Sequence, residues 1–341
     1  MNMGPERINN PKIVSAEGIR KSLASGSHVV VQFNQASSYS ARLLGQLNDI
    51  CQISSDTLEV RFYGHYREAF DAGVLKYLPN VKNLTIDSLD EIYNENAIYY
   101  LQNLSHLSFG VLEFDKPEFL EALDLKHLKS LSLAENRKRN FDLKSLSNCS
   151  ALESFSVDGH SQGIEAIAHL PKLSRVILRY LSKNQNISFL NTVPELKALT
   201  LSLGGRENIS EFTGRALQTL QVLRVQGLQS IGDLKRLPML RNLRIEDQIK
   251  LEDLNLIGSQ LERLHIANCK SLKNITGLEQ QVRLREFKLS KAAIDLNYFK
   301  HFAWPEAMEN IQLLSGSSKW NKATAETLKE QGYRQEFQYW N

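Results

Sequence analysis

The sequence predicts an α/β solenoid, in which short parallel strands stack and each strand is reached by a crossover on the outer side. Two observations predict this fold: an apolar frame that returns at a nearly constant interval, and an alternation inside the frame. Apolar residues stand at relative positions 1, 4 and 6 of the frame, and copies start 20 to 24 residues apart. The twelve copies are residues 57–62, 81–86, 104–109, 128–133, 152–157, 173–178, 196–201, 220–225, 240–245, 261–266, 284–289 and 308–313. Near the eighth copy, residues 217–222 fit the frame as well.

The alternation within each copy predicts a strand with one buried face. Thr57 is the only key position that is not apolar, and position 5 is polar in every copy except at Ile177. Period-2 alternation places positions 4 and 6 on one face of a strand and position 5 on the other. Because the interval between copies is too long for hairpins, we expect the strands to pair in parallel.

The segments between the strands have an apolar rhythm of their own. Ile164, Ile167 and Leu170 are spaced by threes, and Pro171 follows just before the next strand frame. Side chains at i and i+3 eclipse in a 3₁₀ turn, and proline disfavours a helical residue before it. The crossovers are therefore predicted to be 3₁₀ turns or single helical turns that end before each strand.

This pattern resembles the leucine-rich-repeat family, and within it the short class typified by internalins and SDS22-like proteins, whose consensus is roughly LxxLxxLxxLxLxxNxI. The resemblance covers about residues 57–313. It implies a right-handed leucine-rich-repeat horseshoe, with a parallel concave β-sheet and with short helices and 3₁₀ turns on the convex side. Asn136 and Cys269 match the consensus Asn or Cys that bonds backbone between coils. The departures from that consensus position are His160, Leu181, Gly204, Leu228, Gln248 and Ala292.

Each end of such an array needs a cap, because its terminal coils expose core. We expect residues 1–56 to form an N-terminal cap and first β–α coil, residues 57–315 the repeat array, and residues 316–341 a C-terminal helix–strand cap. The predicted elements of the N-terminal part are a capping helix at 16–24 that ends at Gly26, a strand at 28–33, a helix at 40–51 and a helical stretch at 66–78.

The C-terminal cap is predicted to contain a helix over 324–332, with Thr324 near its N-cap and Gly332 as its stop. Residues 334–340 alternate like a final strand. The three tryptophans, Trp304, Trp320 and Trp340, all lie in the last 38 residues. We interpret them as plugs for the open end of the core, with an interface role as the alternative.

Composition and charge argue against several classes of protein. The 41 Lys and Arg nearly balance the 38 Asp and Glu, so the net charge of +3 does not indicate a nucleic-acid or membrane partner. There is no apolar run of signal-peptide length at the start and no stretch of about 18 apolar residues. The three cysteines are far apart and form no CxxC pair. These features predict a cytoplasmic protein that does not contact a membrane.

No catalytic, cofactor or metal motif is present, so the sequence predicts a non-enzymatic protein without cofactors. GxSxG, GxxxxGK[ST], HExxH and GxGxxG are all missing. His265 and Cys269 lie four residues apart, but two residues do not make a zinc site. Cys149 falls in the apolar series of a crossover and is interpreted as a small buried hydrophobe.

The candidate functional surface is the side of the sheet that carries positions 3, 5 and 7. In the first half of the array position 5 is mostly Ser or Thr, whereas the second half is basic. The candidate partner-binding residues are Arg61, Tyr63, Arg175, Ile177, Arg179, Arg224, Arg244, Arg263, His265 and Lys288. A concave basic stripe would suit an acidic protein surface. The alternative is that Glu246 and Glu286 in adjacent columns neutralise the stripe through ordinary cross-strand ion pairs.

The leading functional hypothesis is a monomeric protein-interaction module that binds a partner protein on the concave face. Fold-level analogy favours a bacterial cytosolic inhibitor or immunity-type protein. Two alternatives are an effector that acts in a host cell and a substrate receptor or adaptor of a ubiquitin-type complex. Nucleic-acid binding is disfavoured because aromatic residues are missing from the basic columns apart from Tyr63. The adjacent gene and a pull-down from lysate discriminate between these hypotheses.

Overall fold

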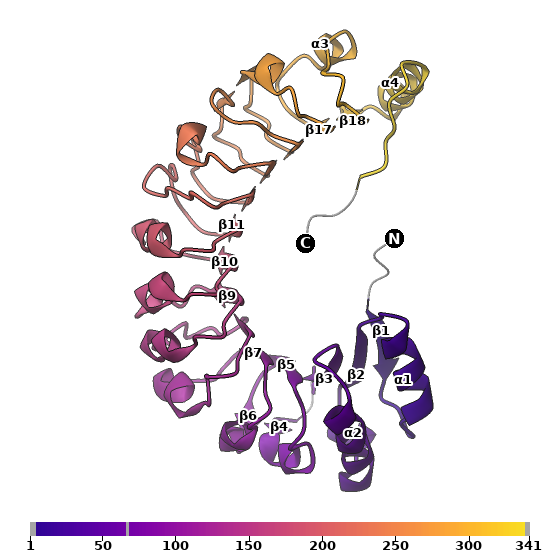
Figure 1. Cartoon of the computed structure of the whole chain (residues 1–341), viewed down its shortest axis with the longest axis vertical. Helices are drawn as coiled ribbons and strands as arrows, with labels where there is room; N and C mark the ends of the chain where they lie inside the picture. The colour runs from indigo at the N-terminus through magenta and orange to yellow at the C-terminus, as the bar shows by residue number, and fades with distance from the viewer. Residues whose placement is uncertain (1–4, 66–67, 338–341) are drawn as a thin grey trace. The chain divides into compact units, whose positions relative to one another are not determined.

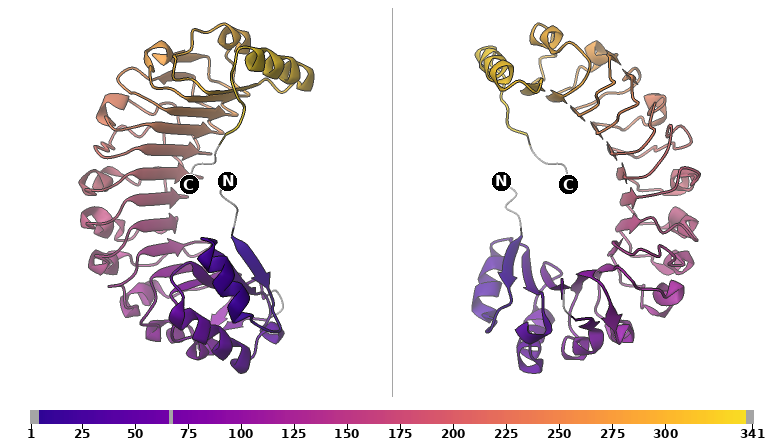
Figure 2. Two further views of the ribbon diagram at one scale, coloured as in Figure 1. Left: turned by 45° about the vertical axis from the view of Figure 1, so that its right-hand side comes forward. Right: turned by 180° about the vertical axis from the view of Figure 1, so that it is seen from behind.

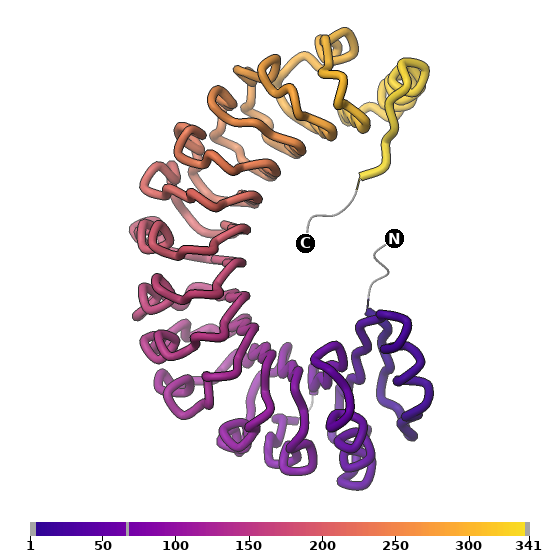
Figure 3. Tube along the Cα trace, in the orientation of Figure 1, coloured from indigo at the N-terminus to yellow at the C-terminus, as the bar shows by residue number. Residues whose placement is uncertain are grey.

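The computed structural model describes residues 5–65 and 68–337, and the chain divides into two compact units, Met1–Leu173 and Ser174–Asn341. Each unit is a stack of coils in which strands form one side, while 3₁₀ turns and short helices form the opposite side (Figure 1). The tube trace shows the successive coils as separate loops of chain (Figure 3). The predicted parallel solenoid is confirmed, with 3₁₀ turns at Ile164–His169 and Leu234–Arg236 where the apolar rhythm of three predicts them.

Unit 1 contains a sheet of parallel strands that neighbour one another in chain order. The strands are β1 (Glu6–Asn9), β2 (Val29–Phe33), β3 (Leu58–Tyr63), β5 (Asn83–Leu89), β7 (His106–Val111), β8 (Ser130–Leu133) and β9 (Ser154–Asp158). The crossovers contain α1 (Ala16–Ala24), η1 (Ala36–Ser38), α2 (Ala41–Ile53), η2 (Ala72–Tyr77), η3 (Glu95–Tyr100), η4 (Pro117–Ala122), η5 (Lys144–Asn148) and η6 (Ile164–His169). A small outer pair is formed by β4 (Phe70–Asp71) and β6 (Ile92–Tyr93).

Unit 2 repeats the arrangement, and its strand arrows stack in parallel (Figure 2). The strands are β10 (Arg175–Arg179), β11 (Ala198–Ser202), β12 (Thr219–Leu223), β13 (Asn242–Glu246), β15 (Arg263–Ala267), β17 (Glu286–Ser290) and β18 (Asn310–Leu314). The crossovers contain η7 (Ser188–Thr192), η8 (Leu234–Arg236), β14 (Asp253–Asn255), β16 (Asn274–Thr276), η9 (Leu278–Gln280) and α3 (Leu296–Lys300). Helix α4 (Ser318–Glu330) follows the last strand.

The core of each unit is built from the predicted apolar triads. Val81, Leu84 and Ile86 are fully buried in unit 1, and Leu261, Leu264 and Ile266 are fully buried in unit 2. The strand burial alternates as predicted, with half-buried residues at positions 3, 5 and 7 of β10, β13 and β15. Each coil therefore buries apolar surface only by stacking on its neighbours, which is the physical basis of a repeat protein.

The predicted register of the eighth copy is wrong, and the alternative frame at 217–222 is the correct one. Gln221 pairs with Thr200 on one side and with Arg244 on the other, so Gln221 occupies position 5. Val222 is fully buried, whereas Leu223 is half-buried on the opposite face. Arg224 comes after the strand and does not belong to the position-5 column.

Side chains other than Asn bond the backbone between coils in this chain. The Asn136 amide donates to the carbonyls of Val111 and Phe114 at 3.0 and 2.6 Å, as the consensus implies. Gln248, which departs from the consensus, donates to the Val222 and Glu246 carbonyls at 3.3 and 2.7 Å. His160 Nδ1 accepts the backbone N–H of Phe141 at 3.1 Å. Longer or aromatic side chains thus satisfy buried backbone groups where the consensus residue is missing.

The two ends of the chain differ in part from expectation. Strand β1 was not predicted, and residues 68–78 contain β4 and a 3₁₀ turn where a helical stretch was expected, with 66–67 outside the described residues. Helix α4 begins six residues earlier than predicted, because Ser317 and not Thr324 caps it, and Thr324 is fully buried inside the helix. Gly332 stops the helix with φ of +94°, as predicted.

The segment after α4 does not form the predicted final strand over its described part. Arg334 makes one isolated bridge to Asn310, and residues 335–337 are irregular. Trp304 packs on the buried Phe287 with ring centroids 4.8 Å apart, as a core plug would, whereas Trp320 donates from its indole to Asn297 at 3.3 Å. Trp340 lies outside the described residues.

Candidate functional site

The sheet surface opposite the core in unit 2, formed by positions 3, 5 and 7 of its seven strands, is here called the strand face. Its position-5 column follows from the strand register and reads Ile177, Thr200, Gln221, Arg244, His265, Lys288 and Gln312. All residues of the strand face lie within the described part of the chain, and five of them are Arg or Lys while two are Glu. The basic residues are Arg175, Arg179, Arg244, Arg263 and Lys288.

Part of this positive charge is neutralised within the sheet. The Arg244 guanidinium lies 2.6 Å from the Glu246 carboxylate, two positions along the same strand. His265 contacts the carboxylate of Glu286 on the neighbouring strand, and the Glu286 side chain is only 7% exposed. The two glutamates that the sequence offered as neutralising neighbours therefore do pair with members of the stripe.

Three other basic residues of the strand face have no carboxylate partner in the described part of the chain. Within residues 5–65 and 68–337, Arg175, Arg263 and Lys288 make no ion pair. Lys288 instead lies over the ring of Phe337, with its Nζ atom 5.6 Å from the ring centroid. Arg175, Ile177 and Arg179 share strand β10 and are all half-buried, so an apolar residue with two charged flanks lies on one face of this strand.

Arg224 lies at the edge of the coils and not on the strand face. Its backbone has a φ of +52°, and its side chain, which is 69% exposed, pairs with Asp247 at 2.7 Å. Hydrogen bonds from Asn268 and Arg224 hold the pKa of Asp247 below its ordinary value. A cavity of about 990 Å³ at this edge is lined by Arg224 together with Tyr180, Leu203, Val225 and Ile249 among others.

The remaining candidates, Arg61 and Tyr63, belong to unit 1 and to a closed polar network. Arg61 binds Asp87 through two hydrogen bonds of 2.8 Å, which raise the pKa of Arg61 above its usual value. The Arg61 guanidinium also lies 4.5 Å from the centre of the Tyr63 ring and donates to Gln32. Arg7 donates to the same Gln32 oxygen at 3.0 Å. The Arg61 side chain is therefore already bound by neighbouring residues of the sheet, and a partner that binds Arg61 has to compete with Asp87.

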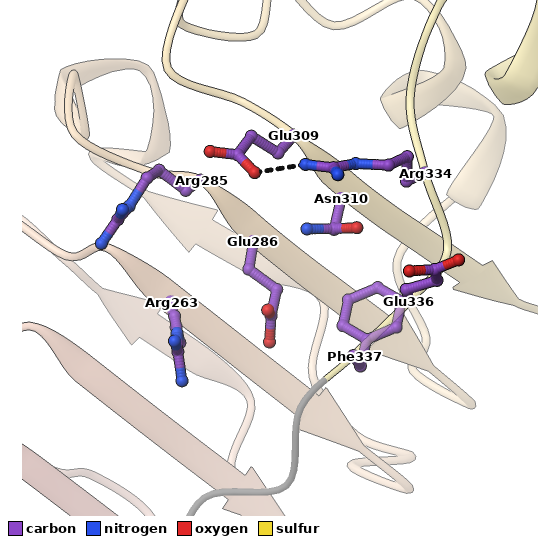
Figure 4. Close-up of a pocket in the computed structure, with 8 residues that line it drawn as sticks. All are labelled: Arg263, Arg285, Glu286, Glu309, Asn310, Arg334, Glu336 and Phe337. Atoms are coloured by element: carbon purple, nitrogen blue, oxygen red, sulfur yellow. Dashed lines mark hydrogen bonds and ion pairs between the residues drawn. The ribbon is translucent and has the colours of Figure 1, made fainter. Parts of the chain in front are cut away.

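A cavity of about 350 Å³ lies on the strand face under the C-terminal segment 334–337 (Figure 4). Its lining residues are Arg263, Arg285, Glu286, Glu309, Asn310, Arg334, Glu336 and Phe337. Arg334 pairs with Glu309 at 2.5 Å across the cavity wall. The Oδ1 atom of Asn310 is buried and has no hydrogen-bond partner in the part of the chain that the structure describes. Only Arg263 of this set was predicted, because the others become neighbours through strand register and the course of the C-terminal segment.

The described residues hold no group of three or more His, Cys, Asp or Glu side chains able to bind a metal ion. All three cysteines are buried and unpaired, and burial raises the pKa of Cys149 to about 12 and that of Cys269 to about 11. Both thiols therefore stay protonated at neutral pH, which disfavours them as nucleophiles. Over the same portion of the chain, every helix is too short or too polar to cross a membrane.

No protein-family profile and no curated protein sequence matches the chain. Among solved structures, the internalin inlF of Listeria monocytogenes is 17% identical over 87% of this chain and 82% of its own, with a TM-score of 0.54. A leucine-rich-repeat protein of Leptospira interrogans is 16% identical over 91% of this chain and 89% of its own, with a TM-score of 0.47. The TLR13 chain of a TLR13–ssRNA13 complex is 15% identical over 94% of this chain and 57% of its own, with a TM-score of 0.49. Together with the stacked parallel strands, the internalin match shows that the chain has the leucine-rich-repeat fold.

Proposed function

We propose that this chain is a protein-interaction module that acts by binding a partner protein of acidic surface on the strand face of unit 2. The observation that carries the proposal is the charge of this face, where Arg175, Arg263 and Lys288 have no carboxylate partner among the described residues. Basic side chains that are held on a rigid sheet attract an acidic surface without reorganisation of the binding protein.

The chemistry of the strand face favours a protein over a nucleic acid. None of the described residues at positions 3, 5 and 7 of the seven strands is Phe, Tyr or Trp, so the strands present no row of stacking platforms for successive bases. Glu246 and Glu286 would repel phosphates. Ile177 and Leu223 supply apolar contact area of the kind that protein interfaces use.

We further propose that the chain acts as a monomeric cytosolic inhibitor or immunity-type protein, whose partner is the protein that it blocks. This finer role follows from fold-level analogy and from the missing catalytic motifs. A gene for a toxin-like or enzymatic partner beside this gene supports it. A neighbouring gene for a protein-export system favours the effector alternative.

The binding test uses the full chain immobilised in native lysate of the source organism, followed by titration of the recovered protein against purified chain. We expect one dominant partner, and we expect the Arg244→Ala, Arg263→Ala double variant to bind it at least tenfold more weakly. A tenfold loss corresponds to about 1.4 kcal/mol, which is an ordinary effect for interface arginines.

Arg224→Ala is the matched control, because it removes the same kind of ion-paired arginine outside the strand face. We expect its affinity to stay within twofold of wild type. A loss confined to Arg224→Ala would place the site at the coil edge and contradict the proposal. A gel shift of RNA or DNA by the wild-type chain that the double variant abolishes would replace the protein partner with a nucleic acid.

A further inference from the structure

The described part of the C-terminal segment lies across the strand face. Arg334 is fixed to β18, since its N–H donates to the Glu309 carbonyl at 2.9 Å and its own carbonyl accepts the N–H of Ile311 at 3.0 Å. Three residues later, the ring of Phe337 lies 5.4 Å from the His265 ring on β15. Arg334 lies one strand spacing, about 4.8 Å, outside β18, so three extended residues together with the Phe337 side chain reach over β18 and β17 to β15. The segment therefore crosses the strands and does not continue the sheet.

Phe337 makes specific contacts at the position where the segment ends its crossing. The Phe337 ring meets the His265 ring edge to face, with an interplanar angle of 75°. Lys288 Nζ lies over the Phe337 ring, and the carboxylate of Glu286 contacts His265. An aromatic ring in contact with a cation and with a second ring is stabilised beyond the effect of its apolar burial. His265 and Lys288 thus form a seat for an aromatic side chain.

The segment fills this part of the strand face incompletely. The cavity of about 350 Å³ remains beside Phe337, and one of its lining residues is Asn310, whose buried amide oxygen has no hydrogen-bond partner among the described residues. Arg263 and Arg285 line the same cavity, and only Arg285 of the two has a carboxylate partner in the described chain, namely Glu262 at 2.5 Å. Glu336 also lines the cavity but forms no ion pair with any described residue. The cavity therefore accommodates a carboxylate next to the aromatic seat, and Arg263 is available to bind it.

We propose that the seat formed by His265 and Lys288, with the cavity beside it, binds an extended peptide segment of the partner that carries an aromatic residue next to a carboxylate. The chain's own residues 334–337 occupy this seat as an internal competitor that the partner segment displaces. This inference rests on the proposed function, because it assigns the chemistry of the partner at the strand face. Leu-rich or basic partner segments do not fit, since the seat offers a cation and the cavity offers Arg263.

The test uses a fluorescein-labelled peptide of residues 333–341 as the probe and measures its anisotropy with two forms of the chain. A chain truncated after Tyr333 has lost the internal competitor, so we expect it to bind the peptide at least tenfold more tightly than the full chain does. An attached segment competes at an effective concentration on the order of millimolar, which is sufficient for this difference. Equal affinities of the two forms would overturn the proposal.

Two kinds of variant localise the binding. We expect Phe337→Ala in the peptide to weaken binding at least fivefold, and Gln335→Ala, which alters a residue outside the cavity lining, to leave it within twofold. Lys288→Ala in the truncated chain is expected to weaken binding at least threefold. The full-length Phe337→Ala variant is the control for misfolding of the truncated chain. Its affinity for the wild-type peptide should be within threefold of the affinity of the truncated chain. If it binds no better than the wild-type full chain, the internal competitor does not exist.

The outcome is separable from that of the proposed function because the peptide experiment contains no partner. If the peptide fails to bind, the aromatic seat is overturned. The strand face as the partner-binding surface is tested separately, by the loss of partner binding in the Arg244→Ala, Arg263→Ala variant. Once the partner is recovered, truncation after Tyr333 is expected to increase its affinity at least threefold. Unchanged or weaker partner binding after truncation would overturn the assigned partner chemistry.

Discussion

His160 is a buried ring at the place where the repeat consensus has an asparagine. It is fully buried, it stacks on Phe141 with ring centroids 4.4 Å apart, and its Nδ1 accepts the Phe141 N–H at 3.1 Å. Its Nε2 atom has no hydrogen-bond partner in residues 5–65 and 68–337. Burial lowers the pKa of His160 to about 4. The folded chain therefore holds a neutral histidine, whereas the unfolded chain holds one with an ordinary pKa near 6.5.

The first prediction concerns the pH dependence of stability. Because the folded pKa of His160 is depressed, its contribution to stability is fully present above about pH 6.5 and is lost as pH falls towards 4. The shift from about 6.5 to about 4 corresponds to a loss of about 3 kcal/mol. We expect the free energy of unfolding, measured by urea titration at several pH values, to fall less steeply in His160→Asn than in wild type over this window.

The control is His127→Asn, which replaces an exposed histidine. It should retain the wild-type pH dependence. Burial also lowers the pKa values of His65 and His106, so both variants keep some loss of stability at acidic pH. Identical pH profiles for His160→Asn and wild type would show that His160 does not remain neutral in the folded chain.

At the scale of elements, strand β12 shows how neighbours fix a register that one segment leaves open. The segment from Leu217 to Val225 contains two overlapping frames with the same apolar spacing. A shift of three residues exchanges the faces of a strand, because three is odd and side chains alternate with period 2. Pairing with β11 and β13 on both sides selects the frame in which Leu220 lies between Leu199 and Leu243.

The second prediction tests this register through two adjacent residues. Val222→Ala removes two methyl groups from a fully buried position, and we expect it to reduce the free energy of unfolding by about 1–3 kcal/mol. Leu223→Ala truncates a larger side chain on the half-buried strand face, and we expect a reduction of less than about 1 kcal/mol. Chemical denaturation of both variants provides the comparison. The opposite order would restore the frame at 220–225 and return Arg224 to the position-5 column.

At the scale of the whole molecule, the two units carry different charge on the sheet surface opposite the core. In unit 1, Arg61 is paired with Asp87 and His28 lies 3.2 Å from Glu59, so this surface is largely compensated. In unit 2, the strand face has five basic and two acidic residues, all described. We therefore attribute electrostatic attraction of a partner to unit 2.

The third prediction concerns the kinetics of partner binding. Steering by exposed charges is screened once the Debye length falls below about 10 Å. We expect the association rate constant, measured by stopped flow, to fall about tenfold between low salt and about 0.5 M salt, with a much smaller change in the dissociation rate. The Arg244→Ala, Arg263→Ala variant should show a shallower salt dependence. An association rate that is independent of salt would remove the electrostatic argument for an acidic partner.

The spacing of apolar residues along the chain was sufficient to predict the fold and most of its core. The triads at positions 1, 4 and 6 were predicted from spacing, and they are buried in ten of the twelve copies; position 1 of the first copy is the exposed Thr57, and the eighth copy is out of register. The 3₁₀ crossovers were predicted in the same way and occur in most coils, whereas the crossover before β15 contains β14 and the one before β18 contains α3. The triads could be predicted because the burial of a repeat position follows from the alternation of apolar and polar side chains within about six consecutive residues. The basic character of the second half of the array was visible for the same reason.

The assembly of the candidate site depends on contacts between residues that are far apart in the chain, and these contacts could not be predicted from local spacing. The pairs Arg61–Asp87 and His265–Glu286 join residues 26 and 21 positions apart, and each depends on which strand positions face one another. The position of Arg224 depended on pairing at both edges of β12, and the seat for Phe337 depended on the C-terminal segment crossing the sheet. Local periodicity encodes which side chains are buried, but the partners of exposed side chains are set by register between coils and by chain segments that have no periodicity at all.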